Sequence, residues 1–391
     1  MIRLFQLLLL IPLGFLFACD EVDWVEPVAT CNNPNPTFTY DKAAEVQAIL
    51  DKYTALGVPG VSMGLKTATQ EWAGASGYAR IEGKVPMQIC HLQYAQSLAK
   101  TYTGVLVMML YEEGKIQLDN SIKDYLPVDI AKNLKGIDEV TVRMLLNHTS
   151  GIFDYAYDYA YATDLLSNQN KTFNYHHFLD YVYGKDLQFT PGSKYDYSNT
   201  NYVLLALIVN QITGQDHSVM MTERIFKPLN LNHTYYHNEP NYLHYSELVN
   251  CYLNRRSDHK IENVTRAQVN NVKSMIGDDG LVATPQDYVH FLEALRQGKI
   301  LKKETLALMT AWVNDSKGEP AYGLGLDYTV KNNTYGYGHS GSGLGAGCLL
   351  YYFPEKDITV FVGVNLGLLI EGPFTELVDE MQKEIFAVVL K

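Results

Sequence analysis

The sequence predicts a mixed α and β protein in which one sheet is assembled from both ends of the chain and a helical subdomain is inserted between them. Strand-like segments occur near the start and again near the end of the chain, at 59–66, 71–79, 322–330, 343–353 and 358–364. Helix-like segments fill the middle. Helical spacing at 42–56 and 371–390 predicts two terminal helices that cover the sheet.

Each predicted element follows from the spacing of its apolar residues. In the first helix the apolar residues recur every three or four positions, at Ala43, Val46, Ile49, Leu50 and Tyr53. The segment from Ser97 to Glu113 is apolar over most of its circumference, which predicts a buried helix closed by Gly114. Further helices are expected at 141–147, 201–212 and 285–296.

Composition limits the classes of function. The chain has 391 residues, of which 47% are hydrophobic and 19% charged, enough apolar material for a large core and too much for a disordered chain. The net charge of −12 leaves no basic surface for nucleic acid, so that partner is not expected. The chain has 29 tyrosines against 14 phenylalanines, which indicates wet clefts or interfaces rather than dry core.

The N-terminal segment predicts export. Residues 1–18 carry one charge, at Arg3, and an apolar run shorter than the roughly 20 residues that a membrane span needs. The run ends in the letters LFAC, which resembles a bacterial lipoprotein signal that leaves Cys19 as the lipid-attached N-terminus. An ordinary signal peptide is the alternative, although no A-x-A site is visible. We expect an extracytoplasmic protein held by lipid on a bacterial membrane, in the periplasm or at the cell surface.

The rest of the chain divides into a tether and one folded domain. Residues 19–40 are acidic and then rich in Pro, Asn and Thr, which is typical of a tether. The folded domain is expected over 41–391, with the sheet part at about 41–95 and 310–391 and the helical part at about 96–309.

The cysteines and histidines predict no metal site. The cysteines are Cys19, Cys31, Cys90, Cys251 and Cys348, and none forms a C-x-x-C pair, which argues against zinc and redox motifs. Disulfides are permitted outside the cytoplasm, but the sequence does not pair these residues. His176 and His177 are adjacent, and His233 and His237 are four apart without the glutamate of H-E-x-x-H.

The first motif that indicates chemistry is Ser-x-x-Lys, at Ser97 and Lys100. Residues three apart share a helix face, so the lysine lies against the serine hydroxyl, and a lysine in such a dry place can act as a base. The alternative is that Ser97 is only a helix N-cap. A second copy, from Ser257 to Lys260, lies in a polar run and is expected to be a solvated loop.

The second motif is Tyr-x-Asn, at Tyr197 and Asn199. It follows a Pro-Gly turn and precedes a helix, where a side chain can project into a cleft. Two further copies, beginning at Tyr236 and Tyr252, lie in polar stretches that no helix follows.

The third motif is His339-Ser340-Gly341, inside a glycine-dense run from 336 to 347. The run matches G-x-G-x-x-G, but a strand rather than a helix follows it, so a dinucleotide site is not expected. Small residues on a strand edge allow another backbone to approach, and an acyl substrate could pair there as an added strand.

In this order and spacing, the three motifs resemble those of the penicillin-binding and class C β-lactamase family of serine hydrolases. The flanking segments match as well, at 147–151 (NHTSG), 197–202 (YSNTNY), 226–229 (FKPL) and 277–285. The resemblance covers about residues 40–391 and implies an α+β, β-lactamase/transpeptidase-like fold. That fold has an antiparallel sheet flanked by terminal helices and an inserted helical subdomain, with the site between them.

The resemblance also implies roles for the motif residues. Ser97 is the nucleophile, Lys100 and Tyr197 share the proton transfers, and flanking cations would have to lower the pKa of Tyr197 for it to act as a base. Asn199 orients Lys100 and the substrate. The residues that bind substrate are therefore expected to be Asn199, His339, Gly341 and Ser342. The backbone N–H groups of Ser97 and Ser342 form the oxyanion hole, and no cofactor is implied.

Several functions stay open. A D-alanyl-D-alanine carboxypeptidase-like peptidase is favoured, with a small-molecule or peptide acyl substrate such as a cell-wall peptide. The alternatives are an esterase or amidase, a β-lactamase, and a surface binding protein with a degenerate site. His339 stands where many relatives have Lys or Arg, which weakens the case for potent β-lactamase activity. Asp278 and Asp279, between two glycines, predict a turn, which the resemblance places near the cleft. The tyrosines at 155, 157, 159 and 161 are expected to line one wall or to form a solvated face.

Overall fold

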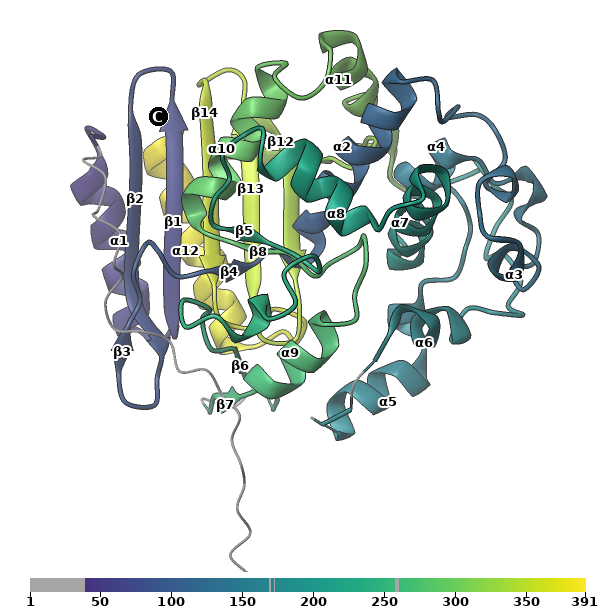
Figure 1. The fold of residues 1–391 in the computed structure, drawn as a ribbon. Coiled ribbons are helices and arrows are strands. Elements are labelled where there is room, and N and C mark those ends of the chain that lie inside the picture. The colour runs from purple at the N-terminus through teal and green to yellow at the C-terminus, as the bar shows by residue number, and fades with distance from the viewer. Residues whose placement is uncertain (1–38, 169, 172, 257–259) are drawn as a thin grey trace, which may run out of the picture.

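A nine-stranded antiparallel sheet forms the centre of the computed structural model, which describes residues 39–168, 170–171, 173–256 and 260–391 (Figure 1). Across the sheet the strands are β3 (Val85–Pro86), β2 (Glu71–Arg80), β1 (Gly60–Thr67), β14 (Ile358–Val364), β13 (Gly347–Phe353), β12 (Thr334–Ser342), β11 (Asp327–Lys331), β10 (Pro320–Tyr322) and β9 (Val313–Asn314). The predicted signal peptide, Cys19 and most of the predicted tether lie outside the described residues.

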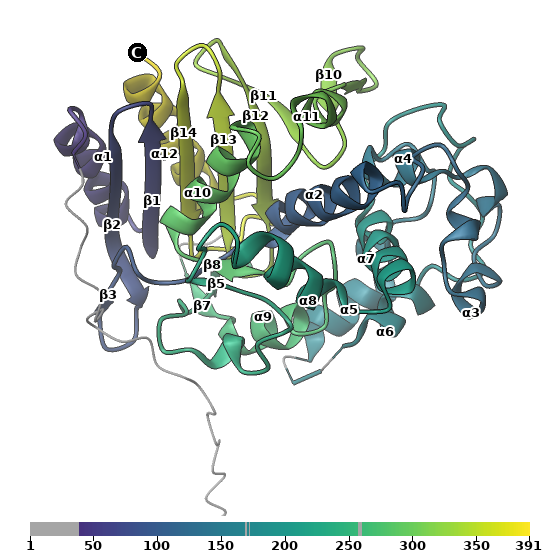
Figure 2. The ribbon, with the colours of Figure 1, turned by 45° about the horizontal axis from the view of Figure 1, so that its top comes forward.

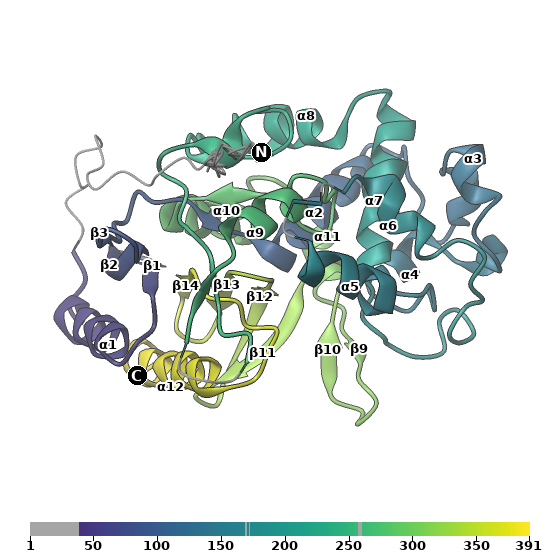
Figure 3. The same cartoon turned by 90° about the horizontal axis from the view of Figure 1, so that it is seen from below.

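The two ends of the chain meet in the middle of this sheet, which confirms the predicted assembly. β1 pairs with β14, and Val61 lies opposite Val364. The terminal helices α1 (Ala43–Ala55) and α12 (Pro373–Val389) pack together over one face of the sheet (Figure 3). Their apolar sides and the sheet share one buried cluster, which includes Val46, Leu50, Val61, Val360, Val378 and Ile385.

The middle of the chain supplies the helices beside the sheet (Figure 2). They are α2 (Ala99–Glu112), α3 (Val128–Ala131), α4 (Val142–Leu146), α5 (Tyr159–Ser167), α6 (Tyr175–Asp180), α7 (Asn199–Thr213), α8 (His217–Met221), α9 (Thr265–Val272), α10 (Pro285–Arg296) and α11 (Lys303–Met309). α2 and α7 pack against each other and bury most of their circumference, as the continuous apolar run after Ser97 predicts. Among the described residues, no helix is long and apolar enough to cross a bilayer.

α10 belongs with the sheet, although the predicted boundaries place it in the helical part. It packs on β1, β13 and β14, on the face away from α1 and α12 (Figures 1 and 3). The ring of Tyr288 stacks on Phe361 of β14, with 4.5 Å between the ring centroids. The sheet is therefore buried on both faces.

The prediction was wrong in detail around the C-terminal strands. The expected strand at 322–330 is two strands, β10 and β11, because the chain turns at Gly325, where φ is +88°. β13 begins at Gly347 rather than at 343, and the glycine run before it forms strand β12. A Cβ at Gly338 would lie 1.9 Å from the carbonyl oxygen of Leu350, so close strand packing explains the glycines.

Two small sheets that the sequence did not indicate occur in the middle of the chain. One contains β4 (Gln93–Tyr94), β8 (Val282–Ala283) and β5 (Thr234–Tyr235), and the other contains β6 (Tyr252–Leu253) and β7 (Glu262–Asn263). Each strand has two residues, which is too short for an alternating pattern to be visible in a sequence.

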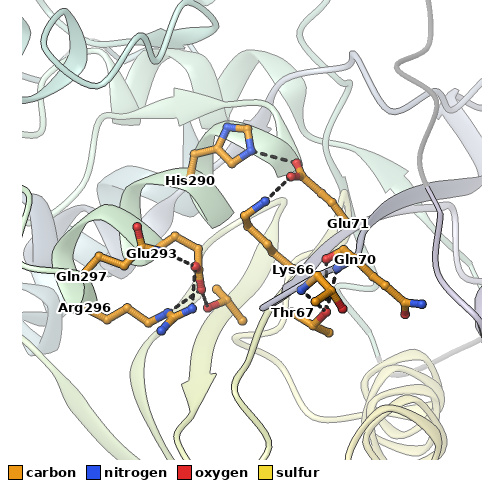
Figure 4. A network of polar contacts seen from close by, with 10 residues as sticks. Lys66, Thr67, Gln70, Glu71, His290, Glu293, Arg296 and Gln297 are labelled. Carbon is orange, nitrogen blue, oxygen red and sulfur yellow. Dashed lines mark hydrogen bonds and ion pairs between the residues drawn. The ribbon is translucent and has the colours of Figure 1, made fainter.

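A network of polar contacts fixes α10 to the sheet (Figure 4). Glu71 of β2 accepts hydrogen bonds from Lys66 of β1 at 2.6 Å and from His290 of α10 at 2.8 Å. On the same helix, Glu293 is buried and accepts from Arg296 at 2.7 Å and from Thr359 of β14 at 2.5 Å. These contacts tie the helix to β2 and β14 at separate points, and Lys66 links β1 to the first of them.

The Glu71 carboxylate is expected to make stability depend on acid pH. Partial burial alone would raise its pKa, but the hydrogen bonds from His290 and Lys66 outweigh burial and lower the pKa from 4.5 to about 2. This stabilisation is therefore present above about pH 4.5 and is lost as the pH falls toward 2. Glu71→Gln is expected to cost about 1 kcal/mol at pH 7 and less at pH 3, measured by urea denaturation. An equal cost at both pH values would contradict this account.

Candidate active site

A cavity of about 670 Å³ brings most of the predicted site residues together. Ser97, Tyr197, Asn199, His339 and Ser342 line it. The other two predicted site residues of the folded domain are buried beside these. Lys100 lies behind Ser97, and Gly341 backs onto the Ser97 segment.

Ser97 and Lys100 are in direct contact. Ser97 lies in a 3-10 turn, η1 (Gln96–Leu98), and Lys100 lies in the first turn of α2. Lys100 Nζ donates hydrogen bonds to Ser97 Oγ at 3.1 Å, Asn199 Oδ1 at 2.8 Å and the carbonyl oxygen of Asp278 at 2.9 Å. Neither η1 nor α2 has a side-chain N-cap, so the alternative that Ser97 is only a cap was wrong.

The environment of Lys100 suits a base. The side chain is fully buried, and burial lowers its pKa although nearby carboxylates oppose the shift. Two of its three partners, the oxygens of Asn199 and Asp278, can only accept. The third, the Ser97 hydroxyl, can reverse its hydrogen bond and donate to a neutral amine. The geometry therefore permits a proton to move from Ser97 to Lys100.

A close backbone approach holds Ser97 against the sheet. The backbone of Gln96 has φ of +50°, a conformation that residues other than glycine seldom adopt. β12 packs on this turn at Gly341, where a Cβ would lie 2.4 Å from the carbonyl oxygen of Ala95 and 3.1 Å from the Ser97 nitrogen. Gly341 thus sets the distance between Ser97 and β12.

Gly341→Ala is expected to push β12 away from Ser97. Overpacking of this kind costs about 1–3 kcal/mol of unfolding free energy, and the displaced backbone slows acylation by about tenfold or more. Urea denaturation and the rate of adduct formation with an active-ester probe measure the two effects. Wild-type values for both would show that the contact at Gly341 is not needed.

Tyr197 lies on the loop directly before α7 and is partly exposed. Its hydroxyl is hydrogen-bonded to Ser97, and its ring centroid lies 5.2 Å from Lys100 Nζ. Burial raises the pKa of Tyr197 well above its usual range, and the hydrogen bond with Ser97 opposes this only in part. The condition for Tyr197 to act as a base, a pKa lowered by neighbouring cations, is therefore not met, because burial dominates. Tyr197 holds its proton at neutral pH and is suited to donate it.

Asn199 is oriented by a carboxyl group that the sequence did not single out. Asp154 accepts from Asn199 Nδ2 at 2.9 Å, which turns Asn199 Oδ1 toward Lys100. Asp154 is almost fully buried, and burial raises its pKa from 3.8 to about 6. The 45 residues between Asp154 and Asn199 leave no local spacing by which the pair could have been found.

His339 is held as a neutral side chain. It lies on β12, buried, where Tyr322 Oη donates to Nε2 at 2.8 Å and Nδ1 donates to the Ser340 carbonyl at 2.5 Å. Burial lowers its pKa, and the charge of Lys100 adds to this although Asp327 opposes it. His339 therefore does not supply the fixed positive charge of a lysine or arginine at this position.

The end of β12 offers backbone donors to the cavity. β11 pairs with β12 only as far as Gly338, so the next four residues extend beyond it. The N–H of Ser340 points to that side, where it donates to Asp327 Oδ2 at 3.1 Å. Successive residues of a strand point their N–H groups to opposite edges, so the N–H of Ser342 points to the same side as that of Ser340. This direction suits its predicted place in the oxyanion hole.

His148, in the segment 147–151, supports Tyr197. Its Nδ1 accepts from the backbone N–H of Ser198 at 3.1 Å, and its ring lies 4.2 Å from the ring of Tyr197 and 4.6 Å from that of Tyr322. The sequence identified this segment only as a flanking match. In the structure His148 is fully buried and its backbone has φ of +59°, two properties that the sequence does not reveal.

Three of the four alternating tyrosines line the cavity. They are Tyr155, Tyr157 and Tyr161, whereas Tyr159 is 91% exposed. Tyr155 Oη donates to Asp278 Oδ2 at 2.5 Å, and Asp278 and Asp279 also line the cavity. The segment is a short 3-10 turn followed by α5, not a strand.

The candidate histidines and the tyrosines of the extra motif copies do not line this cavity. The described residues contain no group of three or more His, Cys, Asp or Glu side chains placed to hold a metal. Tyr236 and Tyr252, from the extra Tyr-x-Asn copies, are buried and bond to His217 and Glu82. The second Ser-x-x-Lys copy, from Ser257, lies outside the described residues except for Lys260.

Comparison with known proteins decides the family. The family model described as Beta-lactamase matches residues 46–372. The chain belongs to the beta-lactamase family. The family match, together with the amidohydrolase and the penicillin-binding protein among the similar proteins, supports a serine hydrolase enzyme. The α+β fold predicted for it is confirmed.

Solved structures of this family resemble nearly the whole described chain. The D-stereospecific amidohydrolase from Streptomyces sp. matches with a TM-score of 0.73 and 26% identity, covering 87% of this chain and 98% of that one. The D-amino acid amidase from Ochrobactrum anthropi SV3, complexed with D-phenylalanine, matches with a TM-score of 0.77 and 25% identity, covering 90% and 100%.

Curated relatives match over shorter stretches. Protein flp of Staphylococcus aureus (strain MW2) is 28% identical over 200 residues, which is 50% of this chain and 39% of that protein. Penicillin-binding protein 4 of Amycolatopsis lactamdurans is 33% identical over 137 residues, which is 35% of this chain and 34% of that protein. The matched part of the chain thus spans well under two thirds of the length of these relatives.

Proposed function

We propose that this beta-lactamase-family enzyme is an amidase or esterase that acts through a Ser97 acyl-enzyme on substrates without a carboxylate. The observation that carries the proposal is the charge of the cavity. Among the described residues that line it, none is Lys or Arg, and His339 is neutral. D-alanyl-D-alanine peptides and β-lactams carry a carboxylate that needs a cationic partner. The amidase and amidohydrolase named among the similar structures support the same choice.

The proposed reaction has two acyl-transfer steps. In its deprotonated form Lys100 takes the proton of Ser97 as Oγ attacks the carbonyl carbon, and the oxyanion is held by the N–H groups of Ser97 and Ser342. Tyr197 gives a proton to the leaving amine or alcohol and regains one from Lys100. Water then attacks the acyl-enzyme and loses a proton to the same pair, which returns a proton to Ser97 Oγ as the acid is released.

A substrate panel tests the proposal. Purified protein is assayed with D- and L-amino acid amides, short-chain nitrophenyl esters, a D-alanyl-D-alanine peptide and nitrocefin. We expect kcat/KM to be at least about 100-fold higher for an amide or ester than for the two carboxylate-bearing substrates, which corresponds to about 2.7 kcal/mol. A preference for the D-alanyl-D-alanine peptide would instead favour the carboxypeptidase.

We also propose that the enzyme is exported and held on a bacterial membrane by lipid at Cys19. The lipoprotein-like segment that ends at Cys19 supports this proposal, as does the disulfide bond of Cys90, since disulfides persist in oxidising compartments. Cys19→Ala is expected to move the enzyme from the membrane fraction to the soluble fraction and to abolish labelling by a fatty-acid probe. Labelling that survives the substitution would contradict the anchor.

A further inference from the structure

We infer that the substrate carries a protonated amine and that Asp327 binds it. The inference rests on the proposed acyl-enzyme function and names the substrate class of the same cavity. Asp154, Asp278, Asp279 and Asp327 all line this cavity. No Lys or Arg is among the described residues that line it. A concave site with this excess of carboxyl groups attracts cations and repels anions.

Asp327 is the carboxyl group best placed for a contact with substrate. It is the first residue of β11 and lies where the edge of β12 becomes free. Ser340 N donates to its Oδ2 at 3.1 Å, Ser340 Oγ at 3.3 Å and Tyr351 Oη at 3.2 Å. These donors fix the carboxyl group through one oxygen. Within the described part of the chain Oδ1 accepts no hydrogen bond, and the side chain is 20% exposed.

The other three carboxyl groups are committed to the protein and nearly fully buried. Asp154 accepts from Asn199, Asp278 accepts from Tyr155, and Asp279 accepts from the N–H of Gly280. One oxygen remains open even here: Asp278 Oδ1 is buried at the cavity wall without a partner among the described residues. This second, independent observation also indicates a donor that arrives with the substrate.

The rest of the cavity fits an apolar group next to the amine. Its wall includes Leu165, Leu166, Leu344, Leu369 and Ile370. Leu166 is 42% exposed and Leu369 58% exposed in the protein alone, so a bound apolar group would remove this surface from water. The substrate class that combines both features is an amide or ester of an amino acid with an apolar side chain and a free amino group.

Isosteric substrates test the inference. Phenylalanine amide carries a charged amino group where its α-hydroxy analogue carries a neutral hydroxyl, and the two are otherwise the same. Both enantiomers of each compound are assayed. We expect wild-type kcat/KM to be at least tenfold higher for the amine. Asp327→Asn should lower this ratio toward one. Asp327→Lys should reverse the order between the amine and an N-succinyl derivative, which is anionic. Glu304→Gln, which removes an exposed carboxylate on α11 outside the cavity, should leave the ratio unchanged.

The outcomes separate this inference from the proposed function. Equal wild-type kcat/KM for the amine and its hydroxy analogue overturns the inference, whether or not the variants fold. A wild-type preference that Asp327→Asn leaves intact overturns the assignment to Asp327. Failure of every amide and ester, together with no covalent adduct on Ser97, overturns the proposed function itself.

Discussion

Replacing Ser97 with Ala is expected to lower kcat by at least about 10⁴-fold and to abolish the covalent adduct that an active-ester probe forms with the wild type. Ser97 Oγ is the one hydroxyl that contacts Lys100 Nζ among the described residues, at 3.1 Å. Without Oγ there is no atom to carry the acyl group, whereas the cavity and the backbone donors remain. Intact-mass measurement after incubation with the probe gives the adduct directly.

The matched control is Ser316→Ala. Ser316 is exposed on the turn between β9 and β10 and does not line the catalytic cavity. This variant should form the adduct at the wild-type rate and unfold at the wild-type urea concentration. An adduct of equal yield on Ser97→Ala would show that another residue is the nucleophile, and the acyl-enzyme mechanism would have to be rebuilt around that residue.

Lys100→Met is expected to have the second-largest effect, with kcat reduced by about 10³-fold or more. Methionine is also unbranched and fills similar space, so the change removes chiefly the amine and its three hydrogen bonds. Ser97 then lacks its base. Burst measurements with a nitrophenyl ester should show that acylation, rather than release of the acid, has become slow.

The stability of Lys100→Met should depend on pH in a defined direction. Burial raises the pKa of Asp279 from 3.8 to about 7, and Lys100 offsets part of this effect. A carboxyl group with a raised pKa supports folding at low pH and loses that contribution as the pH rises through the folded value. Removing Lys100 therefore costs more at pH 8, about 2–4 kcal/mol, than at pH 5. Urea denaturation at the two pH values measures the difference, and a larger cost at pH 5 would contradict this assignment of charges.

The motifs of the candidate site could be predicted because each is set by local geometry. Ser97 and Lys100 are one helical turn apart. Asn199 is the first residue of α7, and Tyr197 lies two residues before it. The ordering of three such motifs then indicated the family. The sheet was predictable for the same reason, since β1, β2 and β14 are continuous apolar or alternating runs.

The residues that tune the site could not be predicted in this way. Asp154 reaches Asn199, and Tyr322 reaches His339, only through the folded chain, across 45 and 17 residues. Whether the pKa of Tyr197 is raised or lowered depends on burial, which the spacing of residues in the sequence does not reveal. β12 was not predicted as a strand because its glycines hide the alternation of apolar and polar residues. They are required instead by close contacts with Leu350 and Ala95.

The pairing of β1 with β14 determines when the enzyme can first become active during its synthesis. A ribosome completes β1 and the Ser97 turn early, but β12, which carries His339 and Ser342, and β14, which closes the sheet beside β1, come last. Contacts between residues so far apart in sequence form slowly and only after the whole domain is available. The nascent chain thus carries Ser97 and Lys100 through translation without the strands that complete the cavity, and the cavity is assembled only once the final strands have emerged.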